Sequence, residues 1–359
     1  MPGETDDSSS VALLCPPARP PEEVEPKTFD RSHCGEVIYM AKKNRRVSVT
    51  QQIMNEVIKI QNEKTVHNLS RKHYIRNTKK FVVFCREHYD CKDFDSCREH
   101  IQDYSDYLQT QGYTPSTIHS YVAAACSTFD VPMQEISKPI RKTSEFIRGR
   151  TQDKNIRTSQ DLNDPEWQYI VSFQRKVGLR RAELYELKKE DFLMDESQHF
   201  TIFVRNGKGH KKQYQRLNSP SDEEFIRKYF DAVGPGERIF DKKYFNNDLN
   251  FHKLRADSAK EYYEIQLHRI LNEPGYASIL KAEIKKRWEL YNINPKTEKP
   301  KHFDESQVQG WYVLRGGNRE KAIREGRPIR YNRLAVMACS IFKLSHWRTN
   351  VTVQNYLAI

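Results

Sequence analysis

The stretch that most constrains this chain lies near its middle and runs from Val177 to Leu184, with the sequence VGLRRAEL. Gly178 predicts a turn at the end of one helix, and Arg180 opens the next helix with Glu183 three residues later. Residues at that spacing share a helix face, so the Glu183 carboxylate can hold the Arg180 guanidinium in one orientation. A guanidinium held in this way suits the oxygens of a phosphate diester. Taken alone, the same spacing also fits an ordinary ion pair at a helix start.

A β-hairpin is predicted to follow. Apolar residues alternate from Phe200 to Val204, and the lysine- and glycine-rich segment 206–212 separates them from a second run that begins at Tyr214. Alternation of this kind, interrupted by glycines, predicts two antiparallel strands joined by a turn. The turn presents Lys208 between two glycines, where it can serve as a functional or a merely solvated cation.

Four further residues with chemically active side chains follow toward the C-terminus. His252 and Arg255 are three residues apart, so they share a helix face. His346 lies in the sequence LSHW, and Tyr356 follows it ten residues later. Each has an ordinary structural explanation when taken singly, either a histidine with satisfied hydrogen bonds or an aromatic residue that packs near a chain end.

In this order, the four motifs resemble those of the tyrosine recombinases, the family of the phage integrases. The motifs are GLRxxEL, the GKG hairpin, HxLR and the final LxH with its tyrosine. The resemblance implies a mainly α fold with a small antiparallel β-sheet, made of a helical core-binding domain and a catalytic domain. The catalytic set that it implies is Arg180, Lys208, His252, Arg255, His346 and Tyr356, with Glu183 orienting Arg180.

These residue types can together cleave a phosphodiester without a metal ion. Tyr356 would be the nucleophile, and its phenol must lose a proton during attack. Arg180 and Arg255 are permanently charged and can hold the non-bridging oxygens. The two histidines can donate to the phosphate or accept the tyrosine proton, and Lys208 can protonate the leaving 5′ oxygen. The resemblance implies a 3′-phosphotyrosine intermediate, no cofactor, and no need for ATP or a divalent ion.

The sequence departs from the family pattern at three places. Ala256 follows Arg255 where many relatives have a second histidine. Ninety residues separate Arg255 from His346, which predicts an insertion over about residues 272–330. Only three residues follow Tyr356, too few for the C-terminal helix that some relatives pack into a neighbouring protomer.

The insertion is expected to be a surface excursion whose ends lie close together, because Arg255 and His346 must reach one phosphate. It carries thirteen basic and eight acidic residues, and its spacing predicts an amphipathic helix around Trp288. The positive charge, including the run 285–287, favours contact with flanking DNA. Its two tryptophans favour docking on a neighbouring protomer instead.

Charge along the chain points to a nucleic-acid partner. The net charge is +12, although residues 1–30 hold seven acidic residues and only two basic ones. With no segment apolar enough to cross a membrane, a basic body of this kind predicts a polyanion partner, and double-stranded DNA is the expected one. Besides the catalytic residues, the expected DNA contacts are Lys211 and Lys212 in the hairpin turn and Arg141 and Lys142 in a basic linker.

The predicted domain organisation follows from these features. It comprises an acidic disordered tail (1–37), a basic arm and helix (38–64), a helical core-binding domain (65–135), a basic linker (136–160) and the catalytic domain (161–359) with its insertion.

The seven cysteines predict free thiols rather than disulfides, because the chain is long and carries no export signal. Cys85 and Cys97 each begin a Cys-Arg-Glu-His sequence, with Cys91 between them, and such pairs can bind zinc. The spacing between the pairs matches no common zinc module, and Cys85 falls on the apolar side of a helix. No metal site is therefore predicted.

The sequence thus favours a site-specific DNA recombinase, the integrase of a mobile element, that acts as dimers and a tetramer on DNA in the cytoplasm, associated with the nucleoid. Two alternatives stay open. One is a type IB topoisomerase or telomere resolvase with the same chemistry, and the other is an inactive DNA-binding relative.

Overall fold

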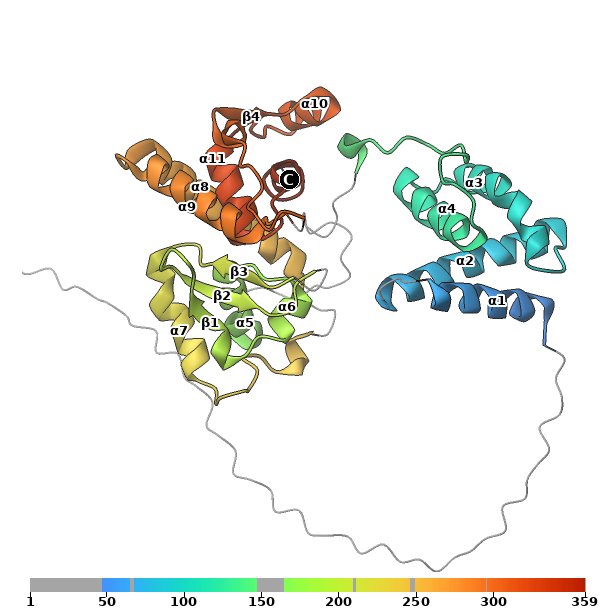
Figure 1. The fold of residues 1–359 in the computed structure, drawn as a ribbon, viewed down its shortest axis with the longest axis horizontal. Coiled ribbons are helices and arrows are strands. Elements are labelled where there is room, and N and C mark those ends of the chain that lie inside the picture. The colour runs from blue at the N-terminus through green and yellow to red at the C-terminus, as the bar shows by residue number, and fades with distance from the viewer. Residues whose placement is uncertain are drawn as a thin grey trace, which may run out of the picture. The chain divides into compact units, whose positions relative to one another are not determined.

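The computed structural model describes residues 47–64, 68–146, 165–208, 211–245, 249–294 and 296–358. The predicted acidic tail, the basic run before the first helix and residues 147–160 of the predicted linker lie outside these ranges. In the described chain helices predominate and the strands form small antiparallel sheets (Figure 1), which confirms the predicted fold class. No helix among these residues is long and apolar enough to cross a membrane. The described chain divides into two compact units, one within residues 1–110 and 119–137 and the other within residues 111–118 and 138–359.

The N-terminal unit is built from helices. They are α1 (Val49–Glu63), α2 (Asn68–Tyr89), the 3₁₀ helix η1 (Asp95–His100), α3 (Ile101–Thr110) and most of α4 (Pro115–Phe129). Phe81 of α2 is fully buried and its ring contacts those of Tyr104 and Phe129, on α3 and α4. Helix α1 contacts α2 and buries Val57, so the helix predicted beside the basic arm belongs to this unit.

The C-terminal unit contains the remaining helices and all the strands of the described chain. Its helices are α5 (Pro165–Val177), α6 (Arg181–Tyr185), α7 (Glu223–Asp231), α8 (Phe251–Asn272), α9 (Tyr276–Tyr291), α10 (Gly316–Arg324), α11 (Arg333–Ala338) and α12 (Thr349–Thr352). Two π-helical turns, η7 (Cys339–Lys343) and η8 (Val353–Leu357), follow α11 and α12.

Two antiparallel sheets accompany these helices. The first has the order β1 (Phe192–Met194), β2 (Phe200–Val204) and β3 (Gln213–Arg216), and the second pairs β4 (Trp311–Val313) with β5 (Arg330–Asn332). Strands β2 and β3 form the predicted hairpin, with Phe203 opposite Tyr214. Ile202 and Val204 point into the core, as their alternation requires, and Phe200 is half-buried.

Two apolar clusters form the core of this unit. One joins α5, α6, the three-stranded sheet and α7 to the first turn of α8. The other surrounds α11 and joins the middle of α8, α9 and the C-terminal turn. Helix α8 contributes to both clusters and contacts α5 and α11, so it links the two halves of the unit.

The prediction that the insertion is a surface excursion is wrong. The expected helix is present as α9, and its Leu280 and Ile284 are buried in the same cluster as α8 and α11. Phe303, Leu314 and Tyr331, from later parts of the insertion, are buried there as well. The apolar residues of the insertion are spread along its sequence, and the fold gathers them into the core of the C-terminal unit.

Arg287 was expected among exposed residues facing DNA, and this expectation is also wrong. Its side chain is buried and donates to Asp195 at 2.7 Å, to Glu196 at 2.6 Å and to the carbonyl oxygen of Tyr214 at 2.9 Å. Lys285, two residues earlier, is exposed. Arg287 therefore links α9 to the three-stranded sheet and the loop beside it through hydrogen bonds of its buried side chain.

Replacing Arg287 by Ala should lower the free energy of unfolding of the C-terminal unit by about 3 kcal/mol, because the substitution removes one of the two guanidinium partners of buried Asp195 and the partner of Glu196. Lys285→Ala, the matched control on the exposed face, should change it by less than about 0.5 kcal/mol. Urea unfolding followed by tryptophan fluorescence measures this unit, since all four tryptophans lie in it. Equal effects of the two substitutions would contradict the buried role.

Candidate active site

A cavity of about 850 Å³ brings together residues from the hairpin turn, the starts of α6 and α8, the end of α9 and the C-terminal segment. Its described lining is Arg180, Lys208, Lys211, Lys212, Gln213, Tyr214, His252, Arg287, Tyr291, Asn292, Ile341, Ser345, His346, Trp347, Arg348, Val351 and Tyr356. Five of the six residues predicted to be catalytic are in this set, and the sixth, Arg255, lies buried beside it. No aspartate or glutamate belongs to the described lining, so the cavity suits an anion.

Arg180 is positioned by the start of α6. It is the residue before the first turn, and Glu183 accepts a hydrogen bond from its main-chain N–H at 2.8 Å and another from its guanidinium. Glu183 is buried, whereas the Arg180 side chain is 23% exposed. The carboxylate thus restricts the rotation of a guanidinium whose remaining donors are accessible from the cavity, the arrangement expected from the spacing of the two residues.

Arg255 lies in the second turn of α8 and is almost completely buried. It donates to the carbonyl oxygen of Gly178 and, at 3.1 Å, to that of Leu344. The pKa of Arg255 is lowered from its ordinary value, because burial and the neighbouring charge of Arg180 outweigh the opposing effects of Glu183 and Tyr356. Its Nε atom is buried and has no hydrogen-bond partner among the described residues.

Gly178 connects these two arginines. Its φ of +69° ends α5 in the left-handed region, and a Cβ atom there would lie 2.8 Å from Oγ of Ser258 on α8. Glycine allows both the turn and the close approach of α8. The carbonyl oxygen of Gly178 can consequently accept from Arg255 while the chain turns toward Arg180.

His346 is held between two residues with positive φ, Ser345 at 52° and Trp347 at 56°. The main-chain N–H of Arg348 donates to its Nδ1 atom at 3.2 Å, so Nδ1 is an acceptor and the neutral ring carries its proton on Nε2. Nε2 is buried with no partner among the described residues. Burial, and then Arg255, Arg180 and Arg348, lower the pKa of His346 to about 3. A neutral His346 is therefore a hydrogen-bond donor toward an incoming group.

Tyr356 lies in the second π-helical turn, η8, between the buried residues Val353 and Leu357. Its ring centroid is 6.1 Å from that of His346. The first π-helical turn, η7, ends at Lys343, which is buried and donates to the carbonyl oxygen of Lys176 at 2.6 Å. Burial lowers the pKa of Lys343 to about 7. The two π turns aim the chain segments that carry His346 and Tyr356 into one cavity.

The remaining predicted residues lie at the rim. Lys208 is exposed in the turn between β2 and β3, and His252 is exposed in the first turn of α8. Lys211 and Lys212, the predicted DNA contacts of the hairpin, are also exposed and line the cavity. The predicted linker contacts Arg141 and Lys142 are exposed but do not line it, and Lys142 pairs with Glu145 at 3.2 Å.

Several lining residues were not predicted from the sequence. Arg348 and Trp347 directly follow His346, so their position beside a predicted site residue was a usable signal. Arg287 belongs to the basic run that was expected to contact flanking DNA, but nothing in the sequence placed it, Tyr291 or Tyr214 at this cavity.

Three buried polar atoms near the cavity have no hydrogen-bond partner among the described residues. They are Nε of Arg255, Nε2 of His346 and Oγ of Ser345. All three can donate, and leaving buried donors unsatisfied costs about 1–3 kcal/mol each. An oxyanion is a kind of ligand that can accept hydrogen bonds from donors of this type.

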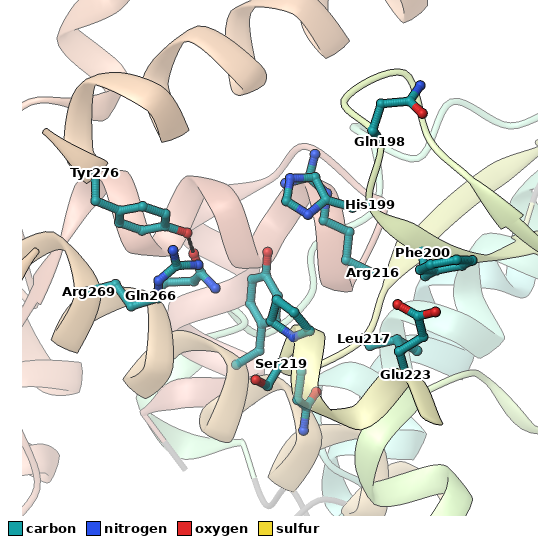
Figure 2. Close-up of a pocket in the computed structure, with 13 residues that line it drawn as sticks. Gln198, His199, Phe200, Arg216, Leu217, Ser219, Glu223, Gln266, Arg269 and Tyr276 are labelled. Carbon is teal, nitrogen blue, oxygen red and sulfur yellow. Dashed lines mark hydrogen bonds between the residues drawn. The ribbon is translucent and has the colours of Figure 1, made fainter. Parts of the chain in front are cut away.

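A second cavity, of about 170 Å³, contains none of the predicted catalytic residues (Figure 2). His199 and Arg216 line one side of it and Tyr276 of α9 another, with the Tyr276 hydroxyl bonded to Gln266 at 2.5 Å. Arg216 is already paired with Asp195 at 2.8 Å and with Glu283 at 2.5 Å. Glu223 also lines this cavity, whereas the described lining of the first contains no aspartate or glutamate.

Comparison with known proteins adds little to this geometry. No protein-family model matches the chain, and no curated protein matches it. Among solved structures, a crystal structure of XerA recombinase is similar, with a TM-score of 0.21 and 13% sequence identity. The match covers 67% of this chain and 99% of that one. Similarity at this level does not assign a function.

We expect the His346 ring to stay neutral between pH 5 and 8 in the DNA-free protein, with its proton on Nε2, because its pKa is about 3. A histidine in the unfolded chain has a pKa of about 6.5 and binds a proton below that pH. The contribution of His346 to stability is therefore complete above about pH 6.5 and declines as the pH falls toward 3. Long-range ¹H–¹⁵N NMR measures the protonation state and the tautomer of the His346 ring, and His346→Gln assigns its signal. A midpoint near 6.5 would show that the ring is not buried in this way.

Proposed function

We propose that this protein cleaves and rejoins DNA strands through a covalent bond to Tyr356. The observation that carries the proposal is the cavity lined by Tyr356, Arg180, Lys208, His252 and His346, beside Arg255 and without a described carboxylate in its lining. A tyrosine is a weak nucleophile in isolation, and it becomes effective where fixed donors stabilise the charge of the attacked phosphate.

In the proposed reaction the Tyr356 oxygen attacks the phosphorus atom of a phosphodiester. The P–O bond to the 5′ oxygen breaks, leaving a 3′-phosphotyrosine and a free 5′-hydroxyl. Arg180 and Arg255 stabilise the negative charge on the non-bridging oxygens, and His346 donates from Nε2 to one of them. Since His346 is then a donor, His252 is the candidate to accept the phenol proton, and Lys208 gives a proton to the leaving 5′ oxygen.

Rejoining is the same reaction in reverse, with a 5′-hydroxyl attacking the phosphotyrosine. The phosphotyrosine bond retains the energy of the cleaved bond, so the cycle needs no ATP. The positive charge comes from side chains, so the proposed reaction also needs no added divalent ion.

At the level of biological role, we propose site-specific recombination that integrates or excises a mobile element, with protomers paired on each DNA site and two pairs joined during exchange. An assay with two differently labelled copies of the target site separates this role from its rivals. Products that join the two labels support a recombinase. Relaxation or hairpin formation on one DNA molecule alone would identify a topoisomerase or a telomere resolvase.

Tyr356→Phe should bind DNA like the wild type and form no covalent adduct, because only the nucleophilic oxygen is removed. The wild-type protein is incubated, without added magnesium or ATP, with random-sequence duplexes and with the DNA that flanks its gene. Adducts that survive denaturation are isolated, and the modified peptide is identified by mass spectrometry. An adduct on another residue, or one formed by the Phe variant, would refute the assignment. No wild-type adduct together with intact binding would favour the inactive DNA-binding alternative.

Lys208→Ala should cleave ordinary DNA about 10²–10⁴-fold more slowly, the usual contribution of a general acid. On a substrate with sulfur in place of the scissile 5′ oxygen, the variant should recover most of its activity, since a thiolate leaves without a proton. Lys211→Ala, in the same turn, is the control. Relative to the wild type, this variant should show the same rate on the sulfur substrate as on ordinary DNA, so the sulfur substitution should give it no specific recovery. An equal defect of Lys208→Ala on both substrates would exclude it as the general acid.

A further inference from the structure

Three cysteines of the N-terminal unit meet at one place. Cys85 lies near the end of α2, Cys91 two residues beyond that helix, and Cys97 in η1. Their sulfur atoms all lie within 4.8 Å of one another, and all three side chains are buried. No other histidine, cysteine, aspartate or glutamate of the described chain joins this thiol cluster.

The two histidines of the repeated Cys-Arg-Glu-His sequences are used elsewhere. Nδ1 of His100 lies 3.0 Å from Asp103, and its ring stacks on Tyr89 with a centroid distance of 3.7 Å. The ring of His88 packs against Phe84. The repeat is therefore not the site that its spacing first suggested, and the three sulfur atoms form a different set.

The loop between α2 and η1 holds the cluster together. Asp90 has a φ of +47° and reverses the chain, after which the N–H of Cys91 donates to the carbonyl oxygen of Cys85 at 3.4 Å. Arg86 donates to the carbonyl oxygen of Cys91 at 2.6 Å and to Asp90 at 2.8 Å. The N–H of Ser96 donates to Asp93 at 2.8 Å. These contacts fix the cysteine positions from both sides of the loop.

We propose that Cys85, Cys91 and Cys97 bind one thiolate-seeking d¹⁰ metal ion, zinc(II) or copper(I). Thiolates are the ligands that select these ions. Zinc–sulfur bonds of about 2.3 Å place the sulfur atoms of a tetrahedral site about 3.8 Å apart, within the separation that the cluster already has. A zinc ion would take a water or a main-chain oxygen as its fourth ligand. The candidate main-chain oxygens are those of Ser96, 3.4 Å from the Cys91 sulfur, and of Asp93, 3.5 Å from the Cys97 sulfur.

The surroundings suit a metal–thiolate group. Three thiolates and a dication carry a net negative charge, and Arg86, bonded to the backbone of Cys91, lies close enough to offset it. A bound ion would link α2 to η1 across a loop of irregular structure. Metal ligation adds directly to folding stability in such small units, so we assign the site a structural role. It is independent of the proposed reaction.

Metal content of the full-length protein tests the proposal. Protein from cells grown with zinc and copper is desalted without chelators and analysed by inductively coupled plasma mass spectrometry. We expect one zinc or one copper ion per chain, and the element found identifies the natural occupant. Cys97→Ser and Cys91→Ser should lower the content by about tenfold or more. Cys126→Ser, the control at a buried cysteine outside the cluster, should leave it unchanged.

Cobalt(II) added to metal-free protein provides a second measurement that does not depend on expression. The wild type and Cys126→Ser should develop the sulfur-to-cobalt charge-transfer absorption of several thiolate ligands, and Cys85→Ser should show a clearly weaker band. Wild-type protein that contains no metal and takes up neither zinc nor cobalt would overturn the proposal. A disulfide between two of these cysteines, detected as the loss of two hydrogen masses in freshly purified protein, would also overturn it. Neither result depends on DNA cleavage, so failure here leaves the proposed function untouched.

Discussion

Arg255 donates hydrogen bonds to the carbonyl oxygens of Gly178 and Leu344, which lie 77 and 89 residues away in the chain. Gly178 stands two residues before Arg180, and Leu344 two residues before His346. One buried guanidinium therefore connects the two segments that carry these side chains. Removing its charge from water is unfavourable, and two carbonyl dipoles and Glu183, 3.9 Å away, offset that cost. The geometry of the candidate active site depends on this contact.

A second buried charge network attaches the insertion to the sheet. Asp195 accepts from Arg216 at 2.8 Å and from Arg287 at 2.7 Å, while Glu283 of α9 accepts from Arg216 at 2.5 Å and lies 2.9 Å from His199. Such networks are stabilising only when most of their members are satisfied, which demands one relative position of α9 and the strands. Helix α9 thereby contributes Tyr291 to the cavity wall, and Trp288 packs against Trp347 next to His346.

Local backbone conformation adds a further constraint around His346 and Tyr356. Two π-helical turns, and left-handed residues on both sides of His346, are costly arrangements that persist only where the surrounding packing imposes them. Here the surrounding packing is a fully buried core around α11. The result is a neutral histidine and a tyrosine that face the same basic cavity.

The sequence by itself determined the local elements and the identity of the candidate site. Alternation predicted the β2–β3 hairpin, helical spacing around Trp288 predicted α9, and the Arg180–Glu183 contact followed from residues three apart on one helix face. These are short-range relationships, so periodicity and side-chain chemistry suffice to infer them. The order of the motifs also named five of the residues that line the cavity, although their catalytic roles stay a prediction. Only the tertiary structure decided the long-range relationships. The burial of Arg287 and the meeting of Cys85, Cys91 and Cys97 depend on how the chain folds back, and the incorporation of the insertion into the core depends on helices far apart in sequence. A charged or apolar residue carries no local mark of the partner it will meet, because that partner is supplied by the packing of the whole unit.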